Sequence, residues 1–177
     1  MNSLLYKIAV LVGLSILLSG CGTDSDKISP GDIAKDFRLD TLTHKRFYLN
    51  QHKDKVVVLV FWTTWCSICK TELVELKSLR NMPGSKNLVV ASICSDPENI
   101  NDAKQLAKNL NIDYPVLLDK RQSVTDRYGI SSFPTTVIID QKGVVSFVRE
   151  GYNSAIANQV KTKVAGLFVS VSGESVE

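Results

Sequence analysis

The sequence has little of what marks a metal site, a disulfide scaffold or a nucleic-acid-binding surface. Its 177 residues include two histidines and four cysteines, and no run of five like charges occurs. Four cysteines are too few for a disulfide scaffold in a chain of this length. Nucleic-acid-binding domains usually carry a clustered basic face. With a formal net charge of only +3, we therefore expect no nucleic-acid partner.

A hydrophobic run long enough to cross a membrane is also missing. The apolar run near the N-terminus extends from Ile8 to Leu18. As a helix it would span about 16 Å, roughly half of a bilayer core. The length is typical of the apolar segment of a signal peptide, so we predict a signal over residues 1–20.

The end of this run resembles the lipobox of bacterial lipoproteins, in which small residues precede a cysteine. Here the segment is Leu18-Ser19-Gly20-Cys21. The resemblance implies that Cys21 becomes the first residue of the mature chain and carries the acyl chains of a membrane anchor. The protein would then lie in a bacterial cell envelope, on the extracytoplasmic or periplasmic side. Gly22 in place of aspartate permits the outer membrane. The alternatives are an ordinary cleaved signal followed by a chance cysteine, or an uncleaved anchor.

Composition divides the remainder of the chain. Residues 21–32 are rich in Gly, Ser, Asp and Pro and predict a lipidated tether. Residues 33–169 are predicted to form one domain, and residues 170–177 a flexible tail. The whole chain is 44% hydrophobic and 22% charged, which is ordinary for a globular protein.

Hydrophobic patterns typical of strands and of helices alternate along the chain and indicate an α/β domain. Strands are predicted at 37–39, 46–49, 55–62, 88–94, 116–118, 135–140 and 144–149. Helices are predicted at 67–79, 101–110, 123–128 and 154–167. This order favours a mostly parallel sheet with an antiparallel edge.

The chemistry is concentrated in a C-x-x-C motif, Cys66-Ser67-Ile68-Cys69, between a predicted strand and a predicted helix. The free N–H groups and partial positive charge of a helix N-terminus stabilise a thiolate. We assign attack on a substrate disulfide to Cys66, which is nearer the helix end, and resolution to Cys69. A zinc site usually needs a second ligand pair, and the only histidines are His44 and His52, both upstream. We therefore expect no metal, and no cofactor beyond the redox-active cysteine pair.

Two segments resemble the TlpA/ResA-like thiol-disulfide oxidoreductases, a family with the thioredoxin fold. They are 61–72 (FWTTWCSICKTE) and 133–143 (FPTTVIIDQKG). The resemblance implies a central mixed sheet flanked by helices, an N-terminal β-hairpin and a helix–strand insert between Leu88 and Leu118.

The resemblance also assigns roles near the cysteines. Pro134 would be a cis-proline beside the disulfide, and the backbone of Phe133 would pair with the substrate chain. Trp65 would form an apolar rim. Glu72 matches a partly buried acid that could take a proton from Cys69. The alternative is that Glu72 is a solvated helix residue.

Two positions depart from related patterns. Val60 stands where cytosolic thioredoxins place a buried aspartate. The dipeptide between the cysteines is Ser-Ile, which leaves the redox potential open. Of the other candidates, Cys94 and Trp62 are interpreted as core residues, and the histidines as surface residues.

The function implied is reduction of protein disulfides, for example in cytochrome c maturation. Electrons would come from a membrane thiol transporter of the DsbD or CcdA kind, since the compartment is oxidising. One alternative is a peroxiredoxin-like peroxidase, because Thr63 and Cys66 have T-x-x-C spacing. Another is a copper chaperone of the SCO kind, although that group uses C-x-x-x-C and a downstream histidine.

Overall fold

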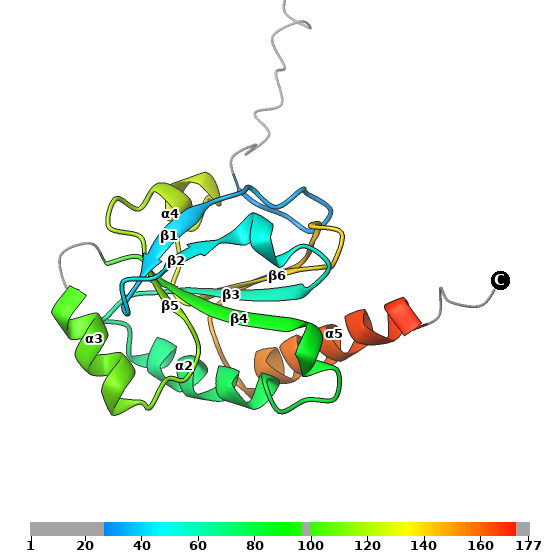
Figure 1. Cartoon of the computed structure of the whole chain (residues 1–177). Coiled ribbons are helices and arrows are strands. Elements are labelled where there is room, and N and C mark those ends of the chain that lie inside the picture. Colours follow the sequence, from blue (N-terminus) through cyan, green and yellow to red (C-terminus); the bar gives the residue numbers. More distant parts are fainter. Residues whose placement is uncertain (1–26, 97–99, 173–177) are drawn as a thin grey trace, which may run out of the picture.

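The structure, a computed structural model, describes residues 27–96 and 100–172 (Figure 1). The predicted signal peptide, Cys21 and the end of the predicted tail lie outside these residues. Within the described ranges, no helix combines the length and the apolar character needed to cross a bilayer.

Seven strands form one sheet in the order β2-β1-β5-β4-β3-β6-β7. The strands are β1 (Arg38–Thr41), β2 (Arg46–Tyr48), β3 (Val56–Trp62), β4 (Leu88–Cys94), β5 (Val116–Leu118), β6 (Thr135–Ile139) and β7 (Val145–Glu150). The helices are α2 (Ser67–Leu79), α3 (Ile100–Asn109), α4 (Ser123–Arg127) and α5 (Ser154–Ser172), with short 3-10 turns η2 (Leu49–His52) and η3 (Ser85–Asn87). The predicted α/β class, N-terminal hairpin and helix–strand insert are confirmed.

The sheet is mixed, which confirms what the family resemblance implied. The order of strands and helices alone favoured a mostly parallel sheet, and that expectation is wrong. Only β3, β4 and β5 run parallel, while β1, β2, β6 and β7 pair antiparallel to their neighbours. The loop before β6 returns the chain to the edge where β3 ends, so that Thr135 pairs with Phe61. Strand β6 must then run back along β3, which a hydrophobic run alone cannot reveal.

Alternate side chains of β3 enter two separate cores. Val56, Val58, Val60 and Trp62 face α2, α3 and α5. Val57, Leu59 and Phe61 face α4 and the N-terminal hairpin. Figure 1 shows α2 and α5 on one side of the sheet and α4 on the other. All seven residues of β3 are buried, as expected for a strand covered on both faces.

Helix α5 runs five residues beyond the predicted end at Leu167. Phe168 packs against Gly84, and the Gln141 side chain donates a hydrogen bond to the Leu167 carbonyl at 2.9 Å. The next helix-breaking residue in the sequence is Gly173. These contacts hold the last turns of α5, and the first residues of the predicted tail are helical.

The predicted tether also differs, since its last residues pack on the domain. Ile28 is 2% exposed in the core under α4, and its N–H donates to the Tyr128 carbonyl at 3.0 Å. Lys27 forms an ion pair with Glu150. One apolar residue within a polar segment is enough to fix this stretch, so residues 27–32 pack as part of the domain.

We predict that Gly84→Ala destabilises the domain more than Gly143→Ala. Both glycines have positive φ (86° and 79°), which costs an alanine about 1 kcal/mol or more. A Cβ at Gly84 would lie 2.8 Å from Phe168 Cδ2, whereas a Cβ at Gly143 meets nothing within 4 Å. In urea denaturation we expect Gly84→Ala to lower the free energy of unfolding by about 1–2 kcal/mol more than Gly143→Ala does. Equal losses would contradict the described docking of α5.

Candidate active site

The end of β3 delivers the chain directly to the first turn of α2. Trp62 is 1% exposed, and its carbonyl accepts the N–H of Ser95 at 2.8 Å. The chain then turns, with the Cys66 N–H donating to the Thr63 carbonyl at 3.2 Å. Cys66 is thereby placed as the N-cap of α2 with extended backbone angles.

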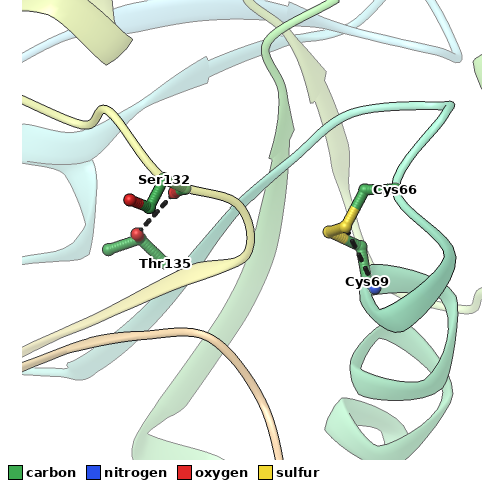
Figure 2. The surroundings of a disulfide bond; sticks show 4 residues. All are labelled: Cys66, Cys69, Ser132 and Thr135. Carbon is green, nitrogen blue, oxygen red and sulfur yellow. Dashed lines mark hydrogen bonds between the residues drawn. A yellow bond between two sulfur atoms is a disulfide. The ribbon is translucent and has the colours of Figure 1, made fainter.

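Cys66 and Cys69 form a disulfide across this first turn, with their Cα atoms 5.3 Å apart. The Cys66 Sγ accepts the backbone N–H of Cys69 at 3.2 Å (Figure 2). No acidic residue lies in the first turn of α2. After reduction, the same N–H groups and the helix dipole favour a thiolate at Cys66.

The two sulfur-bearing residues differ in access, though less than expected. Cys66 is 6% exposed and Cys69 is fully buried, so both lie mostly below the surface. Around them, Trp65 is 70% exposed and Ile68 is 45% exposed. The Trp65 ring meets the Phe133 ring edge-on, with centroids 6.2 Å apart. Cys66 is thus flanked along the chain by two exposed apolar side chains, Trp65 and Ile68.

The loop before β6 faces the disulfide and contains a cis peptide bond between Phe133 and Pro134. The Thr135 hydroxyl donates to the Ser132 carbonyl at 2.7 Å, as Figure 2 shows beside the cysteine pair. The Pro134 carbonyl accepts the N–H of Gly151 at 2.7 Å. These bonds anchor the loop on both sides of the cis bond.

Glu72 is buried in the second turn of α2, and the solvated alternative is wrong. Its side chain is 3% exposed, and its Oε1 accepts a hydrogen bond from the Thr136 hydroxyl. Its Oε2 has no hydrogen-bond partner in the part of the chain that the structure describes. Burial raises the pKa of Glu72 to about 7, although the Thr136 bond opposes the rise. A carboxyl with this pKa can accept or release a proton near neutral pH.

Polar side chains that the sequence did not single out surround Val60. In the sheet, Val60 pairs with Thr136 of β6 and with Ser92 of β4, and both are buried. Tyr114 lies nearby, its hydroxyl donating to the Leu73 carbonyl at 2.7 Å. Burial, and after it the charge of Glu72, raise the pKa of Tyr114. Through its bond with Thr136, Glu72 of α2 brings a carboxyl beside the sheet position of Val60.

Thr136 had a signal in the sequence: it lies two residues after Pro134 within the quoted motif, and alternation along β6 places it on the same face of the sheet as Ile138. Ser92 and Tyr114 had no such signal. Their approach to Glu72 depends on the packing of α2 on β4 and on the segment before β5.

Of the other candidates, Cys94 and Trp62 belong to the same core cluster as Cys66 and Cys69. Cys94 is 1% exposed in the core, and burial raises its pKa to about 11, so the thiol stays protonated at neutral pH. Trp62 is a core residue, as interpreted. His44 is exposed in the hairpin turn, whereas His52 is half-buried against Phe47, with ring centroids 4.6 Å apart.

A dithiol at a helix N-terminus, a cis-proline loop and this sheet define a thioredoxin-fold redox protein. The sequence model of the AhpC/TSA family matches residues 30–148. Thioredoxin-like protein YneN of Bacillus subtilis is 34% identical, over 70% of this chain and 73% of its own length. Thiol-disulfide oxidoreductase ResA of Bacillus thuringiensis is 28% identical, over 97% and 98%. The chain belongs to the AhpC/TSA family and is a thiol-disulfide oxidoreductase of the ResA type.

Solved structures agree on the fold. A Chlorobium tepidum protein described as a putative thiol:disulfide interchange protein DsbE superimposes with a TM-score of 0.75. It is 23% identical, with 80% of this chain and 99% of that chain covered. The exposed lipoprotein thioredoxin Etrx1 of Streptococcus pneumoniae superimposes with a TM-score of 0.62. It is 30% identical, with 73% of this chain and 99% of that chain covered.

We predict that Glu72→Gln removes a pH dependence of stability from the oxidised protein. A carboxyl with a raised pKa in the fold binds its proton more tightly when folded. Its stabilising contribution is therefore complete below the unfolded value of 4.5 and is lost as pH rises through about 7. Relative to that of Glu72→Gln, the free energy of unfolding of wild type should fall by on the order of 3 kcal/mol between pH 4 and pH 8. Urea titrations at each pH measure it.

The matched control is Glu75→Gln on the same helix, whose exposed side chain pairs with Lys161. This variant should follow wild type across pH. If Glu72→Gln also follows wild type, Glu72 is not the buried acid described.

We predict that Cys69→Ser traps mixed disulfides with partner proteins and that Cys66→Ser traps few. Cys66 is the more exposed of the two cysteines, and without Cys69 the neighbouring thiol that would release the partner is missing. Non-reducing electrophoresis of affinity-captured protein measures the adducts. Equal trapping by the two variants would remove the assignment of attack to Cys66.

Proposed function

We propose that the protein reduces disulfides of other proteins outside the cytoplasmic membrane, where it is held by a lipid at Cys21. The observation that carries the chemistry is the position of Cys66. Its sulfur caps α2 and accepts the Cys69 N–H, at the centre of an exposed apolar rim. A reduced Cys66 there is a thiolate nucleophile that a partner protein can reach.

The reaction proceeds by two exchanges. The Cys66 thiolate attacks one sulfur of the substrate disulfide, forms a mixed disulfide and expels the other sulfur as a thiolate. Glu72 accepts the proton of Cys69, and the Cys69 thiolate attacks the Cys66 sulfur. The second substrate sulfur leaves, and both substrate thiolates take up protons. Two electrons pass to the substrate, and Cys66–Cys69 is left oxidised.

The rim supplies the docking site for the substrate chain. Phe133 is half-buried, and its ring meets Trp65 beside the cysteine pair. An extended substrate segment would pair with the backbone at Phe133, as in strand addition, while its side chains contact Trp65. Pro134 has no N–H and so offers the segment no donor of its own.

The reducing direction follows from the compartment. Outside the cytoplasmic membrane thiols are oxidised, so a dithiol protein that reduces others must itself receive electrons. We propose a membrane thiol transporter of the DsbD or CcdA kind as the donor. Disulfide-bearing proteins, including apocytochrome c during its maturation, are the proposed substrates.

Support for the anchor comes from the sequence and from one relative. The pneumococcal structure is titled an exposed lipoprotein thioredoxin. This chain has the lipobox-like Leu18-Ser19-Gly20-Cys21, followed by a polar segment before Ile28 enters the core. That arrangement would keep the domain close to the membrane surface.

A peroxidase is the second candidate, favoured by the T-x-x-C spacing of Thr63 and Cys66. The Thr63 hydroxyl is buried and has no hydrogen-bond partner among residues 27–96 and 100–172. The pairing of Cys66 with Cys69 favours exchange with disulfides instead. Peroxide consumption without a thiol partner would support the peroxidase.

We predict a reduction potential near that of thioredoxin, about −270 mV, for the Cys66–Cys69 couple. Such a value makes the dithiol a donor to strained or exposed protein disulfides, whose potentials are higher. Equilibration with glutathione buffers and quantification of the two redox forms measures it. A value near −120 mV would show an oxidant and contradict the proposed direction.

We predict that Cys21→Ser releases the protein from the membrane and leaves disulfide exchange unaltered. The anchor and the active site are joined only through the segment that ends at Ile28. Detergent phase partitioning of both forms, with exchange rates on a model disulfide, tests this. Wild type in the aqueous phase would contradict the anchor.

A further inference from the structure

A basic hollow lies on the same edge of the sheet as the disulfide. It is formed where β1, β2 and β5 meet the start of α4 and has a volume of about 240 Å³. Its charged lining consists of Arg38, Asp40, Arg46, Asp119, Lys120 and Arg121.

The two acidic side chains of the hollow already have partners. The buried Asp119 carboxylate accepts the backbone N–H groups of Val124 and Thr125 at 3.0 and 2.8 Å, and so caps α4. Asp40 pairs with Arg46 at 3.5 Å. Within the described ranges, Arg38, Lys120 and Arg121 have no ion-pair partner, and all three are exposed. The hollow therefore presents unpaired positive charge to solvent.

Position relates this charge to the reaction. Strands β3, β4 and β5 are parallel, so their carboxyl ends meet at one edge. The Gln122 side chain donates to the Ser95 carbonyl at 3.0 Å, and the Ser95 N–H donates to Trp62. The loop with Lys120 and Arg121 is thereby fixed to the end of β3, four residues before Cys66.

Strand spacing gives the reach. Strand β5 lies two strands from β3 and β1 lies three, so the hollow is about 10–15 Å across the sheet from the end of β3, where the chain turns toward the cysteine pair. A standard interface buries about 800 Å² on each partner and covers such a distance. An interface of this size, centred on Cys66, can therefore extend to the hollow.

We propose that the hollow binds an acidic segment of the partner protein, about three to five extended residues from the cysteine that Cys66 attacks. The proposal rests on the disulfide exchange proposed above. A membrane surface fits less well, because a bilayer against this edge would close the approach to Cys66. Charges beside an interface mainly raise the association rate and make it depend on salt.

The test compares two disulfide peptides that differ only at the positions three to five residues from the attacked cysteine. One peptide carries aspartates there and the other serines. The full chain, reduced and kept in a non-ionic detergent, is used as wild type and as Lys120→Glu/Arg121→Glu. The matched control is Lys53→Glu/Lys142→Glu, which makes the same change of charge at the opposite edge, where the Asp54 N–H meets the Gln141 carbonyl. Hydroxyethyl disulfide reports on the dithiol alone.

We expect the hollow variant to react about tenfold more slowly with the acidic peptide at low salt, with the loss disappearing at high salt. The serine peptide, hydroxyethyl disulfide and the control variant should show no comparable loss. Equal slowing by both variants would reduce the effect to net charge and overturn the proposal. So would slowing with every substrate.

Two further measurements separate the other outcomes. If the hollow variant loses binding to phosphatidylglycerol vesicles while its peptide rates are unchanged, the hollow serves a lipid surface and the proposal is wrong. If wild type reacts with none of the disulfides, the proposed function fails. In that case fluorescence anisotropy measures the binding of an acidic peptide with serines in place of its cysteines. Weaker binding by the hollow variant than by wild type supports the hollow as a binding site, and equal binding contradicts it.

Discussion

Strand β3 is covered by side chains on both of its faces and carries no charged residue along its length. Burying an ionised group within it would require a partner for the charge, and valines occupy the positions that face α2. The strand nevertheless ends where the reacting sulfurs must be placed. The chemistry at that end has therefore to be supplied by neighbouring elements. The cysteines and Glu72 come from α2, the cis-proline loop precedes β6, and Thr136 lies within β6.

Glu72 shows how such an arrangement sets protonation. Its position on α2 brings the carboxyl down onto the sheet beside Val60, away from water. Burial favours the neutral form of the carboxyl. The single hydrogen bond from Thr136 stabilises the carboxylate less than full solvation by water would. The result is a group that changes charge near neutral pH, three residues along α2 from a cysteine that must lose and gain a proton. The apolar rim above the sulfurs serves a different purpose, since it contacts the partner.

The fold and the reacting cysteines were predictable because their signals are local. A buried run, a C-x-x-C at its end and a helical pattern after it fix the strand–turn–helix unit, and Phe133-Pro134 marks the facing loop. The antiparallel course of β6, the packing of Ile28 and the last turns of α5 depend on contacts between distant segments. The surroundings of Glu72 were likewise hidden, because Ser92 and Tyr114 reach it from other elements. Sequence spacing left Glu72 undecided between two roles, and only its burial decides against the solvated one.

The central claim is that the buried carboxyl takes the proton of Cys69. Stopped-flow kinetics of reduced protein with a peptide disulfide, followed across pH, tests it most directly. Glu72→Gln should slow resolution of the mixed disulfide by about 10²-fold or more and spare the first attack by Cys66. Thr136→Val should keep the fast resolution but move its pH dependence upward, because Glu72 loses the bond that lowers its pKa. If both phases keep their rates and pH profiles in Glu72→Gln, the proton goes to water and the account of the carboxyl is wrong.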